Sequence, residues 1–157
     1  MRLFSLTVAL ALAAGGAQAD VSVSYQRPEK FSDLPVGARA RVLDELTAHF
    51  AQLGKQLPPD QHLKIDVTDI DLAGRIDPGR RNFTDVRVLR GKTDWPRIAL
   101  HYTLEANGKV LGAGDESLSD MAYLDRPNRY ADSDHLRYEK KMIDAWFAAK
   151  FGARAGS

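Results

Sequence analysis

Alternating apolar and polar residues predict most of the strands in this chain. The clearest run covers residues 98–104, in which every second residue is Ile, Leu or Tyr, so one face of that strand is expected to be buried. Asn107-Gly108 follows at once and predicts a type I′ hairpin into a returning strand, because both central residues of that turn need a positive φ. Three further strands are predicted at residues 21–25, 63–67 and 85–89.

Two stretches carry apolar residues at the three- and four-residue steps of a helix. The first runs from about residue 36 to residue 57, where a Pro-Pro pair stops it. The second starts near Ser133 or Asp134, either of which can cap a helix, and ends at Gly152. Their apolar stripes consist of Leu43, Leu46, Phe50, Leu53 and Leu57, and of Leu136, Ile143, Trp146, Phe147 and Phe151.

These elements follow one another in the order β-α-β-β-β-β-α. The hairpin-type connections between the later strands predict a mostly antiparallel sheet of about five strands. Both amphipathic helices should cover one face of that sheet and leave the other face more polar. Residues 74–84 and 119–133 are expected to be loops because of their Pro, Gly and charge content. The sequence therefore predicts an α+β two-layer sandwich.

The first nineteen residues carry the three zones of a signal peptide. Arg2 is followed by an apolar stretch at residues 3–14 and by the small-x-small site Ala17-Gln18-Ala19. We expect cleavage before Asp20, which leaves residues 20–157 as one soluble domain. No later stretch reaches the roughly 20 apolar residues of a membrane span. The expected location is the periplasm, with secretion as the alternative.

Composition removes several classes of function. The chain contains no cysteine, so it has no disulfide, no thiolate nucleophile and no thiolate metal ligand. Of its 22 Lys and Arg residues, Arg2 lies in the signal segment, and the remainder equal the 21 Asp and Glu residues. Balanced charge argues against a nucleic-acid partner, because such binding depends on phosphate neutralisation.

The charge is nevertheless unevenly distributed along the chain. Residues 75–97 are mostly basic among their charged positions, whereas residues 115–134 are mostly acidic. Two interpretations stay open. The two stretches neutralise each other within the fold, or the basic stretch lines a recess for an anionic ligand.

Three segments of the chain together resemble one protein family. They are Asp69-Ile70-Asp71-Leu72-Ala73-Gly74, then Asp94-Trp95-Pro96-Arg97, and Glu139-Lys140-Lys141 with Trp146-Phe147 in the last helix. With the start VSVSYQRPEKFSD, they are similar to the DUF3016 family of uncharacterised bacterial proteins with signal peptides. The resemblance covers essentially the whole mature chain. It implies a soluble exported domain from a Gram-negative bacterium and brings no catalytic residues.

Carboxylates at the first of these segments suggest a cation site, which the spacing does not support. Asp69, Asp71 and Gly74 imitate the start of an EF-hand loop, but the fifth and twelfth positions, which need an oxygen ligand and a glutamate, hold Ala73 and Arg80. A looser site for a hard cation, formed by Asp69, Asp71 and Asp94, stays open. The alternative is that these carboxylates accept backbone N–H groups or pair with an arginine such as Arg97. We expect no metal and no cofactor.

The segment before the clearest strand carries an aromatic residue between two charges. Pro96 biases Trp95 towards an extended backbone at a strand entry. Trp95 then either packs over the sheet edge or forms an exposed platform beside Asp94 and Arg97, suited to a sugar or a peptide. His101 faces the polar side of its strand, where it is either solvated or hydrogen-bonded, or paired with Glu105 or another carboxylate for acid–base work.

Glu139-Lys140-Lys141 in the last helix is expected to be a solvated helix face. No nucleophile motif, zinc spacing or cofactor fingerprint occurs in the sequence. We therefore expect a non-catalytic domain that binds a small ligand or an envelope protein. The binding face is predicted to carry Asp69, Asp71, Asp94, Trp95, Arg97 and His101. Two alternatives remain: a carboxylate-dependent hydrolase of envelope glycans, and a structural or assembly component that pairs through an exposed sheet edge.

Overall fold

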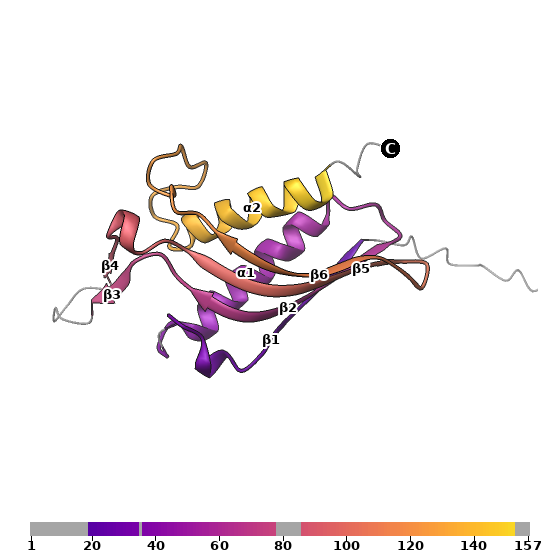
Figure 1. Cartoon of the computed structure of the whole chain (residues 1–157), viewed down its shortest axis with the longest axis horizontal. Coiled ribbons are helices and arrows are strands. Elements are labelled where there is room, and N and C mark those ends of the chain that lie inside the picture. Colours follow the sequence, from indigo (N-terminus) through magenta and orange to yellow (C-terminus); the bar gives the residue numbers. More distant parts are fainter. Residues whose placement is uncertain (1–18, 35, 78–85, 153–157) are drawn as a thin grey trace, which may run out of the picture.

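The main sheet orders its strands β1-β2-β5-β6 and is mostly antiparallel (Figure 1). The computed structural model describes residues 19–34, 36–77 and 86–152, so residues 1–18 of the expected signal segment lie outside the described residues. Within this part, the sheet consists of β1 (Asp20–Tyr25), β2 (Gln61–Asp71), β5 (Arg97–Ala106) and β6 (Lys109–Ser119). β1 pairs with β2 in parallel, and the other two pairings are antiparallel.

The hairpin between β5 and β6 forms where the sequence predicts it. Asn107 and Gly108 have φ angles of 51° and 74°, as the type I′ turn requires. The returning strand carries an irregularity: Leu104 is opposite Gly112 and Glu105 is opposite Val110. Leu111 is thus the extra residue of a β-bulge, next to one of the glycines of this strand.

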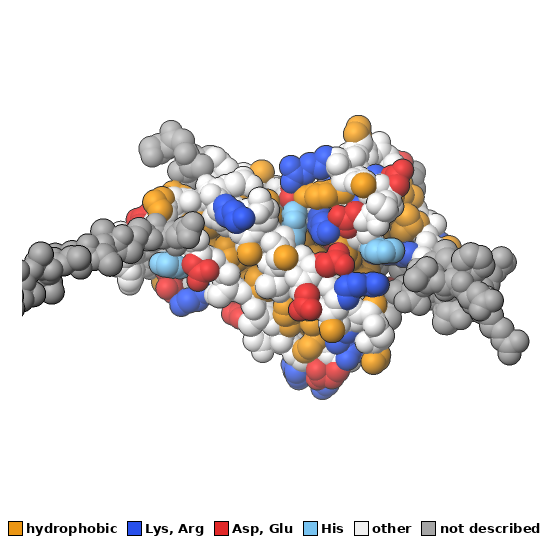
Figure 2. Space-filling view, turned by 180° about the vertical axis from the view of Figure 1, so that it is seen from behind, with side chains coloured by type: hydrophobic (Ala, Val, Ile, Leu, Met, Phe, Trp, Pro, Cys, Tyr) orange, Lys and Arg blue, Asp and Glu red, His pale blue; other side chains and the backbone are white. Residues whose placement is uncertain are grey.

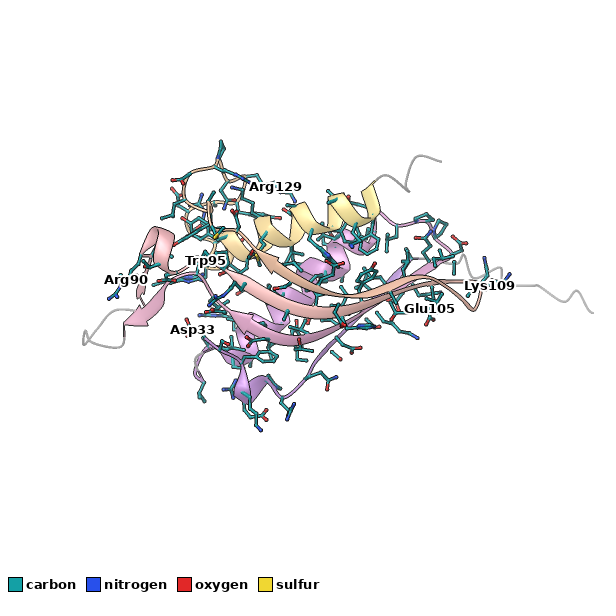
Figure 3. The ribbon with its side chains drawn as sticks, viewed as in Figure 1. Asp33, Arg90, Trp95, Glu105, Lys109 and Arg129 are labelled. Carbon is teal, nitrogen blue, oxygen red and sulfur yellow. The ribbon has the colours of Figure 1, made fainter. Side chains whose placement is uncertain are left out.

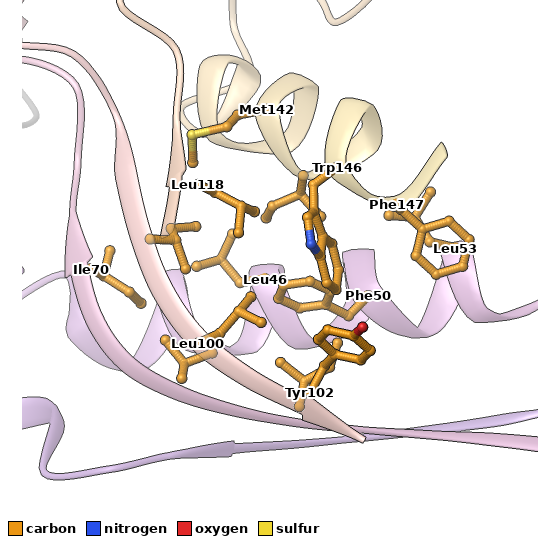
Figure 4. Packing of buried hydrophobic residues seen from close by; sticks show 14 of the residues in the cluster. Leu46, Phe50, Leu53, Ile70, Leu100, Tyr102, Leu118, Met142, Trp146 and Phe147 are labelled. Atoms are coloured by element: carbon orange, nitrogen blue, oxygen red, sulfur yellow. The ribbon is translucent and has the colours of Figure 1, made fainter. Parts of the chain in front are cut away.

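Two α-helices of the described part cover one face of the sheet (Figure 1). They are α1 (Arg39–Gly54) and α2 (Arg137–Phe151). Their apolar stripes pack against the alternate residues of β2 and β5 that point to the same side, and the aromatic side chains gather around Trp146 (Figure 4). The opposite face carries Lys64, His101 and Glu105, which are exposed or half-buried. The α+β class and the two-layer arrangement predicted from the sequence are therefore confirmed.

A smaller two-stranded sheet lies beyond one end of the main sheet. It consists of β3 (Arg75–Asp77) and β4 (Val86–Val88). The prediction of a loop over residues 74–84 was wrong for residues 75–77, because their pairing with β4 depends on a contact that no local pattern reveals. Residues 78–84 lie outside the described residues. Two short 3-10 helices, η1 (Pro28–Lys30) and η2 (Gly91–Thr93), complete the elements.

Both helices begin later in the chain than the sequence predicts. α1 starts at Arg39 after a turn, and α2 starts at Arg137 rather than near Asp134. The carboxylate of Asp134 accepts the N–H of Leu136 at 2.9 Å and pairs with Lys140 at 2.8 Å. Asp134 therefore stabilises the turn that precedes the helix. None of the helices in the described residues is long and apolar enough to cross a bilayer.

Candidate functional site

A pocket of about 450 Å³ lies at the end of the sheet where β2 finishes and β5 begins. Asp33, Arg90 and Trp95 lie together at this end of the molecule, whereas Glu105 and Lys109 mark the opposite end (Figure 3). The residues that line the pocket are Asp33, Asp71, Gly74, Arg90, Thr93, Asp94, Trp95 and Arg97.

Strand pairing brings Asp71 and Arg97 together. Asp71 is the last residue of β2 and stands opposite Arg97, the first residue of β5. Asp33 reaches the same place because it forms an isolated parallel bridge with Asp71, and its N–H donates to the carbonyl of Ile70 at 3.1 Å. Three separate segments of the chain thus meet at one edge of the sheet.

The turn after β2 completes the wall of the pocket. Gly74 has a φ of +81°, and a Cβ at this position would lie 2.6 Å from the carbonyl oxygen of Val88. Only glycine fits a backbone with both constraints. The N–H of Gly74 donates to the carboxylate of Asp94, which ties the segment after β2 to the segment before β5.

An arginine links the acidic and aromatic parts of the pocket. The guanidinium of Arg97 donates two hydrogen bonds to Oδ2 of Asp71, one of them from Nε at 2.9 Å. Its central carbon also lies 5.5 Å from the centroid of the Trp95 ring, within the range of a cation–π interaction. The pair is partly exposed at its Arg97 side, so we assign it an orienting role rather than a large contribution to stability.

Three carboxyl groups share the pocket, and they affect one another. Burial raises the pKa of Asp33 above its ordinary value, and the negative charges of Asp71 and Asp94 raise the pKa further. The positive charge of Arg87 acts in the opposite direction. Asp33 therefore gains a proton at a higher pH than an ordinary aspartate does.

Several polar atoms remain available to a ligand. Asp71 and Asp94 each use one carboxylate oxygen within the described residues, Oδ2 of Asp71 and Oδ1 of Asp94. The other oxygen of each has no protein donor in that part of the chain. Arg90 and Thr93 are exposed at the rim, and no ion pair joins Arg90 to a described carboxylate. The pocket thus offers both acceptors and donors.

Four of the six residues predicted for the site line this pocket, namely Asp71, Asp94, Trp95 and Arg97. Asp69 lies on the neighbouring surface, where its carboxylate accepts the N–H of Ser32 at 2.7 Å and the hydroxyl of Ser32 at 2.6 Å. Asp69 therefore holds the segment after β1 against β2. This contact agrees with the alternative in which the carboxylate accepts a backbone N–H group instead of binding a cation.

His101 lies further along β5, on the open polar face. Its Nδ1 lies 2.8 Å from Oδ1 of Asp115 on β6, whereas Glu105 pairs with Lys64 at 3.1 Å. The structure therefore does not join His101 to Glu105 or to the pocket. Alternation placed His101 on the correct face of its strand, but it could not place it along the strand relative to the pocket.

Sequence reasoning missed Asp33, Arg90 and Thr93 as pocket residues. Asp33 is separated from Asp71 by the whole of α1 and most of β2, so only the tertiary structure brings them together. Arg90 directly precedes the short helix η2, and Thr93 is the last residue of that helix. Their position just before Asp94 and Trp95 in the sequence was the one available signal.

A buried ion pair supports the wall behind the pocket. Glu139 is completely buried, and it accepts hydrogen bonds from Arg87 and, at 2.9 Å, from the N–H of Ala73. The prediction of a solvated face at residues 139–141 was wrong at Glu139. The helix turns this side chain towards β4 and the Ala73-Gly74 turn, where Arg87 compensates its charge.

The basic stretch does not pair with the acidic stretch in the described residues. Arg87 pairs with Glu139 and Arg97 pairs with Asp71, both outside residues 115–134. Acidic and basic side chains are interspersed on the back of the molecule rather than separated into two regions (Figure 2). No group of three His, Asp or Glu side chains among the described residues is arranged to hold a metal ion.

The fold and this pocket define an α+β domain with a polar recess at one end of its sheet. The family model of DUF3016, a protein of unknown function, matches residues 19–149, and the chain belongs to this family. A crystal structure of a Xanthomonas campestris protein described by the family model DUF330 is similar over 98% of this chain and 97% of that chain, with 15% identity and a TM-score of 0.36. The comparison with curated proteins gave no match.

Proposed function

We propose that this protein is an exported, periplasmic binding protein that holds a small neutral saccharide in the pocket around Trp95. The observation that carries the proposal is the convergence of Asp71, Asp94, Trp95 and Arg97 on one open pocket of about 450 Å³. A volume of this size lies in the range of small-molecule sites. The binding itself involves no chemical step.

The charge of the pocket favours a neutral ligand over an ion. Three carboxyl groups face the two guanidinium groups of Arg90 and Arg97. With all three carboxyl groups ionised, these side chains carry one net negative charge, and protonation of Asp33, which its raised pKa favours, would remove that charge. An anion would meet the carboxylates, and a cation would meet the guanidinium groups. A neutral polyhydroxylated compound meets neither penalty, because each hydroxyl can donate to a carboxylate and accept from an arginine.

The aromatic ring supplies the apolar part of the site. Trp95 is half-buried and lines the pocket, and Arg97 fixes its orientation from one side. A pyranose ring presents an apolar face of C–H groups as well as its hydroxyls. The combination of one aromatic ring and charged hydrogen-bonding groups therefore suits a saccharide better than a wholly polar ion.

The binding proposal can be tested by titration of the purified domain, residues 20–157, with neutral mono- and disaccharides from bacterial envelopes. Calorimetry should show binding that Arg90→Ala weakens about tenfold, because a hydrogen bond to a charged group is worth about 1.5–3 kcal/mol. Arg41→Ala is the matched control, since Arg41 is exposed on α1 and does not line the pocket. Binding that Arg90→Ala leaves unchanged, or binding only of short peptides, would contradict the proposal.

The proposed location rests on the signal-peptide pattern of residues 1–19. Expression of the full chain in a Gram-negative host, followed by fractionation, tests it directly. The protein should occur in the periplasmic fraction, with Asp20 as its first residue by mass spectrometry. A cytoplasmic product that keeps residues 1–19 would refute the proposal.

A second candidate function is hydrolysis of an envelope glycan by a carboxyl pair. The observation that favours it is Asp33, whose pKa is raised beside the carboxylates of Asp71 and Asp94. An acid with a raised pKa next to an ionised carboxylate is the combination that glycoside hydrolysis uses. Release of reducing ends from peptidoglycan, abolished by Asp33→Asn, would establish this function. Binding without release would exclude it for that substrate.

A further inference from the structure

A second pocket, of about 310 Å³, lies between β6 and α2. Contiguous residues of the strand line one side of this groove, and residues of α2 line the other side. Its lining includes Ser117, Ser119, Arg126, Lys141, Ala145 and Trp146. None of these residues lines the pocket around Trp95, so the groove is a separate surface.

The strand side of this groove is an unpaired sheet edge. β6 is the last strand of the main sheet in the described part of the chain, and it pairs only with β5 there. The N–H of Asp120 donates to the carbonyl of Pro96 at 3.3 Å. Backbone groups alternate in direction along an antiparallel strand, so those of Ser117 and Ser119 point away from β5. They are available to another extended chain.

The helix side of the groove holds a buried hydrogen-bond donor without an acceptor. Trp146 is 8% exposed and lines the groove. Its indole nitrogen lies on the side of the ring that faces Leu118 of β6 (Figure 4). The indole N–H has no hydrogen-bond partner among the described residues, and buried donors are normally satisfied. A hydrogen-bond acceptor of a ligand at the base of the groove would satisfy this N–H group.

Two basic side chains give the groove its charge preference. The ammonium group of Lys141 donates only to the carbonyl of Arg126, at 3.3 Å, and neither side chain pairs with a described carboxylate. Two carboxylates also line the groove: Glu116 is paired with Lys150 at 2.5 Å, and Asp120 accepts the N–H of Ala122 through Oδ1 at 3.1 Å. An acidic group of a ligand would therefore meet two cations that have no other carboxylate partner in the described part of the chain.

We propose that β6 accepts an extended, acidic segment of another protein as an additional strand. The backbone of the segment would pair with Ser117 and Ser119, which supplies affinity without regard to side chains. Its acidic side chains would contact Arg126 and Lys141, and its apolar ones would contact Ala145, which is exposed on α2. The proposal is independent of saccharide binding at Trp95.

A defined peptide tests this proposal. The probe is the acetylated and amidated hexapeptide Val-Thr-Glu-Val-Glu-Val, titrated into the ¹⁵N-labelled domain of residues 20–157. The expected result is a shift of the Trp146 indole resonance and protection of the Ser117 and Ser119 amides from hydrogen exchange. The Trp95→Phe variant identifies the Trp146 signal, because the chain contains two tryptophans.

Two controls make the result decisive. The double variant Arg126→Glu/Lys141→Glu should bind the peptide about tenfold more weakly, since two charge pairs become repulsive. The double variant Arg41→Glu/Lys55→Glu makes the same charge change at exposed positions of α1 and its end, and should bind as the unaltered domain does. Equal weakening by both variants would overturn the proposal, because it would show attraction by net charge alone.

The remaining outcomes also decide the question. Shifts confined to Trp95 and the first pocket would overturn the proposal and leave the saccharide site as the place where peptides bind. Concentration-dependent shifts of Ser117 and Ser119 without peptide would replace the acidic segment by a second copy of this chain. A version of the peptide that is N-methylated at alternate residues should fail to bind, and tight binding of that peptide would exclude strand pairing.

Discussion

Arg87 on β4 and Glu139 on α2 form a two-point ion pair that joins the small sheet to the last helix. The same carboxylate accepts the N–H of Ala73, and Arg87 also donates to the carbonyl of His135 at 2.6 Å. The buried carboxylate thus connects three segments, and Arg87 adds a fourth, the segment before α2. The turn that carries Gly74, and with it one wall of the pocket, is fixed by this contact.

Removal of one partner of this pair should be costly. We expect Glu139→Ala to lower the free energy of unfolding by about 3–5 kcal/mol, because Arg87 and the Ala73 N–H lose their buried acceptor. Urea denaturation gives the value. Glu45→Ala is the control, because Glu45 is partly exposed and meets Lys140 only at 3.6 Å, so it should cost about 1 kcal/mol or less. If Arg87→Met/Glu139→Met were as unstable as Glu139→Ala, the loss would not come from an uncompensated charge.

Replacement of Gly74 by alanine should destabilise the protein more than replacement of Gly108, which also has a positive φ. Gly74→Ala combines the cost of the left-handed region, about 1–2 kcal/mol, with overlap against the carbonyl oxygen of Val88 at 2.6 Å. Gly108 has a φ of +74° and open space around its Cβ position. Gly108→Ala should therefore lose only the first contribution. Thermal unfolding of both variants measures the difference, and equal losses would show that the crowding at Gly74 relaxes.

Asp33 should reduce stability at neutral pH. Its pKa is raised in the folded protein, so the folded state favours the protonated carboxyl group. Protonation of Asp33 therefore stabilises the folded protein. This stabilisation is fully present below pH 3.8, the ordinary pKa of an aspartate, and it is lost as the pH rises through the pKa of Asp33 in the folded protein. Asp33→Asn should raise the melting temperature at pH 7 and change it little near pH 3. Asp44→Asn, at an exposed position of α1, should show no such difference between the two pH values.

His49 should make the protein less stable in mild acid. Burial lowers the pKa of His49, although the nearby carboxylate of Asp144 opposes this effect. The unfolded chain therefore binds a proton first, and the unfolding free energy decreases as the pH falls below the model-peptide value of 6.5. The decrease ends at the folded pKa. Lys140 and Tyr130 are the other polar groups that face this ring.

Urea denaturation between pH 5 and pH 8 tests this dependence. His49→Gln should flatten the pH profile of stability, whereas His62→Gln should leave its slope unchanged, because His62 is exposed on β2. A profile that keeps its slope in His49→Gln would assign the effect to another group.

Local patterns were sufficient for the four strands of the main sheet, the two long helices and the class of fold. The alternation of residues 98–104 buries one face of β5, since side chains of a strand alternate in direction. The apolar stripe of residues 43–57 places α1 against the sheet, and the Asn107-Gly108 turn makes β5 and β6 antiparallel neighbours. Each of these features depends on residues within about twenty positions of one another. The sequence by itself therefore determined the α+β sandwich and the apolar faces that α1 and β5 bury.

Only the tertiary structure decided which polar residues share a site. Asp33 meets Asp71 because a parallel bridge joins segments separated by a helix and a strand, and Glu139 is buried because β4 brings Arg87 to it. Asp69 and His101 were predicted for the same site, yet they lie outside the pocket, where they contact Ser32 and Asp115. Periodicity specifies the direction of a side chain from its own element, whereas the position of that element relative to distant segments depends on the packing of the whole core.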